Sequence, residues 1–165
     1  MNDETTAGPA LRVVGGGRGA GRTVWVVNGP NLGRLGSREP DIYGRVDAEE
    51  LARRVAAWGG ELGLDVTLKQ SDDEATVMGW IHEAADRGIG VVLNPAAFTH
   101  YSYGLRDAVA DLTARGGVLV EIHISNPSSR ETFRHTSVIS GVATGTIAGF
   151  GLDSYRLALS ALAAR

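Results

Sequence analysis

Short runs of β-branched apolar residues alternate with amphipathic stretches of helical length along the chain from Thr23 onward. This alternation is typical of α/β proteins, in which helices cover a parallel sheet. The runs are apolar on both faces, as expected of strands that lie between two helical layers rather than in hairpins. The predicted strands are Thr23–Val27, Asp65–Gln70, Gly90–Asn94, Val118–His123 and Ala143–Ala148.

The intervening stretches carry the start signals and the apolar periodicity of helices. Asp47 followed by Glu50 predicts a capping box at the start of the first helix, and Ser71 with Glu74 repeats this signal before the second. Apolar residues at helical spacing then fill one face of each helix. Two further helices are expected over Tyr103–Ala114 and after Leu152.

Right-handed crossovers between five parallel strands give a doubly wound sheet, most simply in the flavodoxin-like order 2-1-3-4-5. Ligands of such sheets bind beyond the carboxyl ends of the strands, at the switch point between strands 1 and 3. Polar residues gather at these strand ends, and they are Asn28, Asn31, Asn94, His123 and Ser125. The predicted fold and the placement of polar residues therefore indicate a site at the same edge.

Composition excludes several classes of protein. The 165 residues fit one domain, with residues 1–22 expected to form a flexible extension and residues 23–165 a single domain. A net charge of -3 argues against a nucleic-acid partner. The absence of cysteine excludes disulfides, thiolate catalysis and zinc–thiolate sites. No apolar run of membrane-spanning length or signal-peptide pattern is present, so no membrane association and a cytoplasmic location are expected.

The first candidate group for proton transfer lies in the glycine-rich stretch between Asn28 and Gly44. Tyr43 is a poor base at its ordinary pKa of about 10, and a nearby cation would lower that pKa. Arg38 in the same stretch supplies such a cation, and the length of the loop suggests a lid. The competing interpretation is a surface loop in which Tyr43 packs and Arg38 is solvated.

The second candidate lies in the stretch Glu121-Ile122-His123-Ile124-Ser125-Asn126. Strand alternation puts Glu121 and His123 on one face, where the carboxylate can orient and support an imidazole acid. Base and acid would then come from different elements of the fold.

Other kinds of site receive little support from the sequence. No histidine has a neighbour at metal-ligand spacing, so no metal is expected. The run Gly15-Gly16-Gly17 precedes the first strand, which is the wrong side for a nucleotide cofactor, and no cofactor is expected. Lys69, the single lysine and the only candidate for a Schiff base, is interpreted as a solvated charge at the end of a strand.

Three further basic residues are candidates for substrate contact. His100 follows Asn94 by six residues and can reach back toward the sheet edge, or it can be a helix-start histidine without a ligand. Arg130 and Arg134 share one helical face if their segment is helical, and one of them could clamp a carboxylate. Solvated arginines are the competing interpretation.

Four motifs in order along the chain resemble the type II 3-dehydroquinate dehydratases. The matching stretches are VWVVNGPNLGRLGSREPDIYG, LNPAAFTHYSYGLRDA, VEIHISNPSSRETFRHTS and ATGTIAGFGLDSYRLAL. The resemblance covers about residues 23–165. Ala96 and Ala97 depart from the family pattern, because many members carry one or two glycines there.

This resemblance implies a flavodoxin-like subunit that dehydrates 3-dehydroquinate to 3-dehydroshikimate through an enolate, without metal or Schiff base. Tyr43 matches the base that removes the C2 proton, and Arg38 matches the cation that keeps it reactive. His123 matches the acid that protonates the departing C1 hydroxyl, with Glu121 supporting it. Asn31 matches the residue that helps to hold a water at the enolate oxygen.

The resemblance also implies an assembly and a set of substrate contacts. The family forms a dodecamer, a tetramer of trimers, and Asp107 matches a position that reaches into a neighbouring subunit's site. The substrate contacts carried over are Asn94, His100, the Ile124 and Ser125 backbone amides and Arg134. The alternative function is a non-catalytic flavodoxin-like module that binds a small anion or a protein. The shared chemistry does not distinguish aromatic biosynthesis in the shikimate pathway from quinate breakdown.

Overall fold

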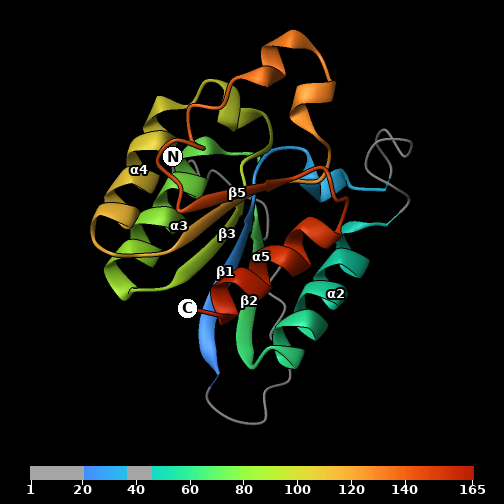
Figure 1. Cartoon of the computed structure of the whole chain (residues 1–165), viewed down its shortest axis with the longest axis vertical. Helices are drawn as coiled ribbons and strands as arrows, with labels where there is room; N and C mark the ends of the chain where they lie inside the picture. The colour runs from blue at the N-terminus through green and yellow to red at the C-terminus, as the bar shows by residue number, and fades with distance from the viewer. Residues whose placement is uncertain (1–20, 37–45) are drawn as a thin grey trace, which may run out of the picture.

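The computed structural model describes residues 21–36 and 46–165. A parallel sheet of five strands in the order β2-β1-β3-β4-β5 forms the centre of the molecule, which confirms the predicted doubly wound, flavodoxin-like α/β topology (Figure 1). The strands are β1 (Arg22–Asn28), β2 (Leu64–Gln70), β3 (Gly90–Asn94), β4 (Leu119–His123) and β5 (Gly145–Ala148). Their bounds lie within two residues of the predicted ones.

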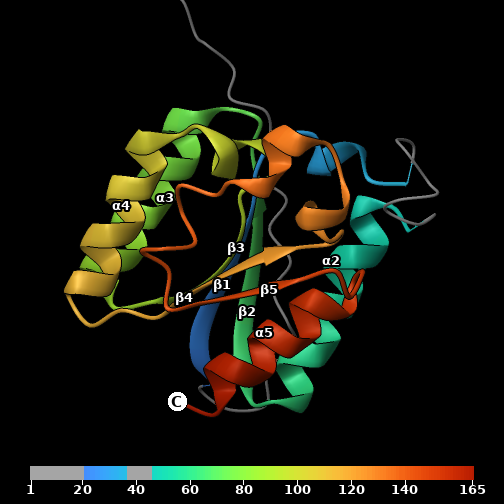
Figure 2. The same cartoon turned by 45° about the horizontal axis from the view of Figure 1, so that its top comes forward.

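In the described part of the chain, four α-helices cover the two faces of the sheet. Helices α2 (Ala48–Glu61) and α5 (Asp153–Ala163) lie on one face, and α3 (Glu74–Arg87) and α4 (Tyr103–Ala114) lie on the other (Figure 2). Four short 3-10 helices lie in the connections: η1 (Leu32–Arg34), η2 (Ala96–His100), η3 (Pro127–Ser129) and η4 (Thr132–His135).

Strand alternation divides the core into two halves. In β1, Val24 and Val26 pack with α2 and α5, whereas Trp25 and Val27 pack with α3 and α4. All four side chains are at most 4% exposed, so β1 is buried on both faces. This burial explains the continuous apolar runs in the sequence.

Of the two predicted helix starts, the one at Asp47 is confirmed and the one at Ser71 is wrong. Asp47 caps α2 by accepting a 2.8 Å hydrogen bond from the backbone N–H of Glu50, as expected. The box predicted from Ser71 and Glu74 is wrong, because Asp73 caps α3 and accepts from the N–H of Thr76 at 2.8 Å. An aspartate directly before the first helical residue reaches that amide, which leaves Ser71 to accept a hydrogen bond from the N–H of Asp73.

The interpretation of Lys69 as a solvated charge is also wrong. Its Nζ lies 3.3 Å from the centroid of the Trp25 ring and 4.0 Å from Glu83, and its side chain is 16% exposed. The reason is that a lysine buries its aliphatic stem along an apolar surface while its ammonium group binds the face of an aromatic ring.

Two predictions fall on residues outside the described part of the chain. Residues 1–20 of the expected extension are among these, and so are Arg38 and Tyr43. Both predictions therefore stay predictions. Within residues 21–36 and 46–165, no helix has the length and apolar character needed to cross a membrane.

Candidate active site

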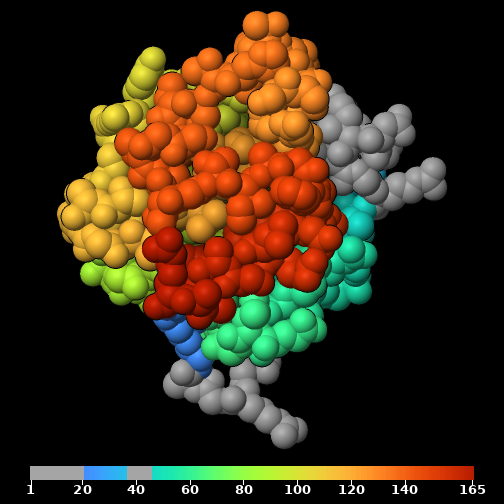
Figure 3. All heavy atoms as spheres, viewed as in Figure 1, coloured from blue at the N-terminus to red at the C-terminus, as the bar shows by residue number. Residues whose placement is uncertain are grey.

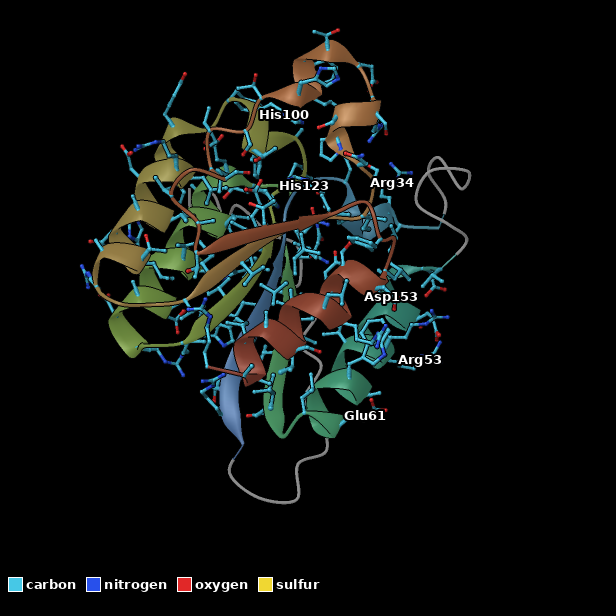
Figure 4. The ribbon with its side chains drawn as sticks, in the orientation of Figure 1. Arg34, Arg53, Glu61, His100, His123 and Asp153 are labelled. Atoms are coloured by element: carbon cyan, nitrogen blue, oxygen red, sulfur yellow. The ribbon has the colours of Figure 1, made fainter. Side chains whose placement is uncertain are left out.

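A pocket opens at the carboxyl edge of the sheet, where the sequence placed the site. The space between its lining residues, counted together with the open solvent at its mouth, is about 760 Å³. Figure 4 shows His100, His123 and Arg34 together at this end, and the segment of η3 and η4 projects there in the space-filling view (Figure 3). The lining residues are Pro30, Asn31, Leu32, Arg34, Leu35, Asn94, Ala96, Ala97, His100, His123, Ile124, Ser125, Pro127, Arg130 and Arg134.

His123 and Glu121 form the predicted pair on one face of β4. The His123 Nε2 atom lies 2.7 Å from Glu121 Oε1, and Glu121 is fully buried behind the imidazole. His123 lines the pocket. Because Nε2 faces the carboxylate, Nδ1 is the ring nitrogen left for a ligand. This geometry suits an imidazole acid whose orientation is fixed by a carboxylate.

Three hydroxyl groups surround the buried carboxylate of Glu121. Thr99 Oγ1 donates to Oε1 at 2.5 Å, and Ser140 Oγ donates to Oε2 at 2.5 Å. Ser137 Oγ lies 3.2 Å from Oε1. Burial alone raises the pKa of Glu121, but hydrogen bonds from His123, Ser140 and Thr99 outweigh burial and bring this pKa below its ordinary value.

A second buried network holds the ends of β1 and β3 together on the α5 face. The hydroxyl of Tyr155 donates to Asn28 Oδ1 at 2.9 Å and accepts from Asn94 Nδ2 at 3.0 Å. Tyr155 is fully buried, and burial raises the pKa of its phenol far above the ordinary value. Tyr155 thereby orients the side chain of Asn94, which lines the pocket.

Sequence analysis did not single out Tyr155, although a signal was available. Tyr155 falls on the same helical face as the apolar residues Ala158, Leu159 and Leu162. A tyrosine on an apolar helical face usually finds a hydrogen-bond partner for its hydroxyl. Arg34 also lines the pocket without having been predicted.

The loop after β1 passes close to the end of β3 before it reaches the pocket. The N–H of Gly29 donates to the carbonyl of Asn94 at 2.8 Å, and a Cβ at Gly29 would lie 2.6 Å from the carbonyl oxygen of Pro95. Asn31 follows with a left-handed φ of 67°, which asparagine tolerates better than most residues. Its N–H donates to Asp72 Oδ1 at 2.8 Å, so the backbone of this pocket wall is fixed from both sides.

Ala96 adopts a left-handed backbone in the opposite wall, with a φ of 49°. Glycine adopts this conformation without steric cost, so an alanine places strain at this position. The N–H of Ala96 donates to Asn94 Oδ1 at 3.2 Å, which is one interaction that holds the strained residue.

The basic residues predicted to contact substrate lie at the pocket. The Nδ1 atom of His100 is 2.8 Å from the carbonyl oxygen of Thr136, and His100 lines the pocket, as its expected reach toward the sheet edge requires. Arg130 and Arg134 both line the pocket, but no single helix contains both, so the condition for a shared helical face is not met. Arg130 follows η3 and Arg134 lies in η4, so the two belong to separate short turns.

The remaining predicted contacts divide into two groups. Ile124 and Ser125 follow β4 directly and line the pocket. Asp107 lies on α4 with its side chain 73% exposed, and it pairs with Arg106 at 2.8 Å. Asp107 does not line the pocket of its own chain.

The described residues offer acid–base groups and cations for anion binding. Within these residues, no group of three or more histidine, aspartate and glutamate side chains is placed to hold a metal ion. The polar groups at the pocket include the buried imidazole–carboxylate pair, a second histidine, two asparagines and three arginines. Such a set can protonate a leaving group and bind a carboxylate substrate.

Comparison with known proteins identifies a family of this fold. The family model for dehydroquinase class II matches residues 22–163. A 3-dehydroquinate dehydratase of Salinispora arenicola is 57% identical over 142 residues, covering 86% of this chain and 97% of the relative.

Solved structures show the same relationship. The type II dehydroquinase of Propionibacterium acnes superposes with a TM-score of 0.84 at 53% identity, covering 87% of this chain and 97% of that one. The type II dehydroquinase of Butyrivibrio crossotus gives a TM-score of 0.83 at 41% identity, with 87% and 99% covered.

The fold and the comparisons thus define a flavodoxin-like α/β enzyme, with a pocket lined by His123 at the carboxyl edge of its sheet. The chain belongs to the class II dehydroquinase family. It is therefore a hydro-lyase, an enzyme that removes water from its substrate.

Proposed function

We propose that the chain converts 3-dehydroquinate to 3-dehydroshikimate by general acid–base elimination through an enolate. The observation that carries the proposal is the buried Glu121–His123 pair at the wall of the pocket, with Nε2 and Oε1 2.7 Å apart. An acid oriented in this way suits the departure of a hydroxyl group, which needs a proton as its C–O bond breaks.

The proposed reaction begins with loss of the proton at C2, beside the ketone. Tyr43 accepts this proton as the base, and the cationic Arg38 favours its phenolate form. The electrons of the C–H bond form an enolate, whose oxygen is stabilised by a water that Asn31 helps to hold. Asn31 lines the pocket, which agrees with this role.

Collapse of the enolate then forms the C=C bond and breaks the C1–O bond. His123 donates its proton to the leaving hydroxyl, which departs as water, while Glu121 supports the imidazolium. Exchange with solvent removes the proton gained by Tyr43 and restores the one lost by His123. Each of the two proton-transfer groups typically contributes about 10²–10⁴-fold to the rate.

Substrate binding uses the arginine and histidine of the pocket wall. Arg134 binds the substrate carboxylate, and Asn94 and His100 bind hydroxyl groups together with the backbone amides of Ile124 and Ser125. The position of Asn94 is supported by its hydrogen bond from Nδ2 to the Tyr155 hydroxyl at 3.0 Å.

The proposed mechanism uses neither a metal nor a Schiff base. The single lysine supports this part of the proposal, because Lys69 Nζ lies over the Trp25 ring at 3.3 Å and Lys69 does not line the pocket. A Schiff base requires an amine that reaches the substrate carbonyl.

We also infer a dodecamer, a tetramer of trimers, that works in the cytoplasm in the shikimate pathway or in quinate breakdown. In this assembly Asp107 reaches the pocket of a neighbouring subunit. Its high exposure and its position away from its own pocket support that inference. Light scattering of the purified protein tests the assembly.

The function is tested by incubating the purified protein with 3-dehydroquinate and following the ultraviolet absorption of the conjugated enone. A parallel sample is treated with borohydride, which would trap a Schiff base. Enone formation in both samples is expected, and Tyr43→Phe should reduce it by orders of magnitude. Absence of enone from an assembled, folded protein would contradict the proposal and favour a non-catalytic binding module.

A further inference from the structure

Glu121 accepts more hydrogen bonds than its contact with His123 requires. Its Oε1 atom accepts from His123 and from Thr99, and its Oε2 atom accepts from Ser140 at 2.5 Å. Ser137 lies beside Thr99, with the two hydroxyl oxygens 2.6 Å apart. We call Thr99, Ser137 and Ser140 the hydroxyl cage. The cage leaves neither carboxylate oxygen without a donor.

The hydrogen bonds of the cage run in one direction. Ser137 Oγ accepts from the N–H groups of Ile139 at 3.1 Å and Ser140 at 2.9 Å, so its own proton is available to donate. Because the single hydroxyl proton of Thr99 goes to Glu121, the proton of Ser137 is directed to Thr99 at 2.6 Å or to Glu121 Oε1 itself at 3.2 Å. The chain from backbone amides through the hydroxyls to the carboxylate polarises each hydrogen bond in it.

The surroundings of Glu121 contain little other charge. Its register neighbours are Leu93 on β3 and Thr146 on β5. The buried side chains of α4, which packs on this face, are Leu105, Ala108, Val109 and Leu112. Among the described titratable groups, His123 is the one that shifts the titration of Glu121 by charge or by hydrogen bonding. The other donors to the carboxylate are neutral hydroxyls.

These contacts matter most once His123 has released its proton. Glu121 then faces a neutral imidazole, and a fully buried carboxylate without donors would take up a proton of its own. A protonated Glu121 no longer supports the imidazolium of the next cycle. We propose that Thr99, Ser137 and Ser140 are positioning residues that keep Glu121 ionised while His123 is neutral. This inference rests on the proposed role of His123 as the acid.

A purely structural role explains the cage less well. A buried ion pair contributes little to the stability of a fold. A protein with well-packed apolar residues at the same positions is often equally stable. The hydroxyls act on the protonation state of Glu121, so their removal should change a pH profile. A packing defect alone lowers the stability of the fold but does not shift the dependence of kcat on pH.

The first test compares Thr99→Val and Ser140→Ala with the wild-type protein in the enone assay over a range of pH. Loss of a hydroxyl donor favours the protonated form of Glu121, so the acidic limb of the kcat profile should move to higher pH. At a given pH on this acidic limb we expect kcat to fall about tenfold, as for a protonation equilibrium displaced by about one pH unit, with kcat on the plateau and KM nearly unchanged.

Thr113→Val is the matched control, because Thr113 Oγ1 donates only to carbonyl groups, including that of Val142 at 3.0 Å. It removes the same hydroxyl from the same residue type without contact to Glu121. Thr99→Ser should restore both the wild-type kcat and the position of the acidic limb. Profiles of Thr99→Val and Ser140→Ala that match those of Thr113→Val would overturn the inference.

The second test needs neither turnover nor a variant that folds. In the wild-type protein labelled with ¹³C at glutamate and histidine, NMR titration reports the protonation of Glu121 and His123 separately. We expect Glu121 to stay ionised at every pH at which His123 is neutral. A proton on Glu121 in that range would overturn the inference, whereas an inactive wild-type protein would overturn only the proposed function.

Discussion

Two buried polar networks meet at the carboxyl edge of the sheet, and they differ in charge. On the α3 and α4 face, Glu121 is an anion surrounded by His123 and the hydroxyl cage. On the α5 face, Tyr155 links the neutral amides of Asn28 and Asn94. The charged network contains groups that gain and lose protons, whereas the neutral network only fixes positions.

The two networks separate two tasks that both need buried polar groups. A buried carboxylate requires several donors, because an unpaired charge is far more costly than an unpaired amide. A neutral bridge is satisfied by one hydroxyl that donates once and accepts once. Disturbing the first network should therefore change chemistry and pH dependence, and disturbing the second should change mainly stability.

The largest effect is expected from His123→Asn, which removes the acid from the charged network. We expect kcat in the enone assay to fall about 10²–10⁴-fold, the usual contribution of such a group. His82→Asn makes the same substitution at an exposed position of α3 and should leave kcat unchanged. Equal activity of the two variants would remove His123 from the mechanism.

Glu121→Gln tests whether the charge of the carboxylate, beyond its shape, is needed. We expect kcat to fall about 10²-fold, at the lower end of the loss for an acid.

The fold lowers the pKa of Glu121 from its ordinary 4.5, so the carboxylate stabilises the fold above that pH. This contribution is lost as the pH falls through the lower pKa of the folded state.

Urea unfolding at a series of pH values between neutral and acidic checks the second part of this prediction. The wild-type protein should lose more stability on acidification than Glu121→Gln, since the variant has no carboxylate to titrate. Glu61→Gln, at the exposed end of α2, should behave like the wild type. Parallel stability curves for Glu121→Gln and the wild type would contradict the assignment.

Tyr155→Phe breaks the neutral network and should act mainly on stability. It leaves Asn28 Oδ1 and Asn94 Nδ2 without their buried partner, which costs about 1–3 kcal/mol of the free energy of unfolding. We expect kcat to fall only a few-fold, with the shape of its pH profile unchanged. Tyr103→Phe, at a residue 69% exposed, is the matched control. A shifted pH profile for Tyr155→Phe would mean that the two networks are coupled.

Asp73→Ala gives the baseline for a change in stability that touches neither network. Asp73 caps α3 through the N–H of Thr76, and loss of such a cap costs about 1 kcal/mol. Chemical denaturation should show this loss, and the enone assay should show an unchanged kcat. A reduced kcat of Asp73→Ala would show that destabilisation alone lowers activity. The losses of kcat expected for His123→Asn and Glu121→Gln could then not be assigned to chemistry.

The sequence allowed the sheet and half of the charged network to be predicted. Apolar runs identify strands because both faces of the sheet are covered, and right-handed crossovers leave few strand orders. Alternation along one strand brought Glu121 and His123 together, and the structure confirms their contact at 2.7 Å. These predictions depend on short-range periodicity, which a sequence displays directly.

The remaining contacts depend on long-range packing, which no periodicity displays. Tyr155 reaches Asn28 across 127 positions of sequence, and Ser137 and Ser140 lie in an irregular segment between η4 and β5. Local competition also misled the predictions, because Asp73 displaced Ser71 as the cap of α3. Capping residues that stand close together in sequence cannot be ranked without their backbone geometry.

The position of Lys69 has a practical consequence for labelling the protein. It is the only lysine in the chain, and its amine lies between Trp25 and Glu83 on the edge strand β2. A dye attached to this amine would sit three strand spacings, about 14 Å, across the sheet from β4. Such a dye marks the only side-chain amine, outside the pocket, and the adjacent indole reports on it by its fluorescence.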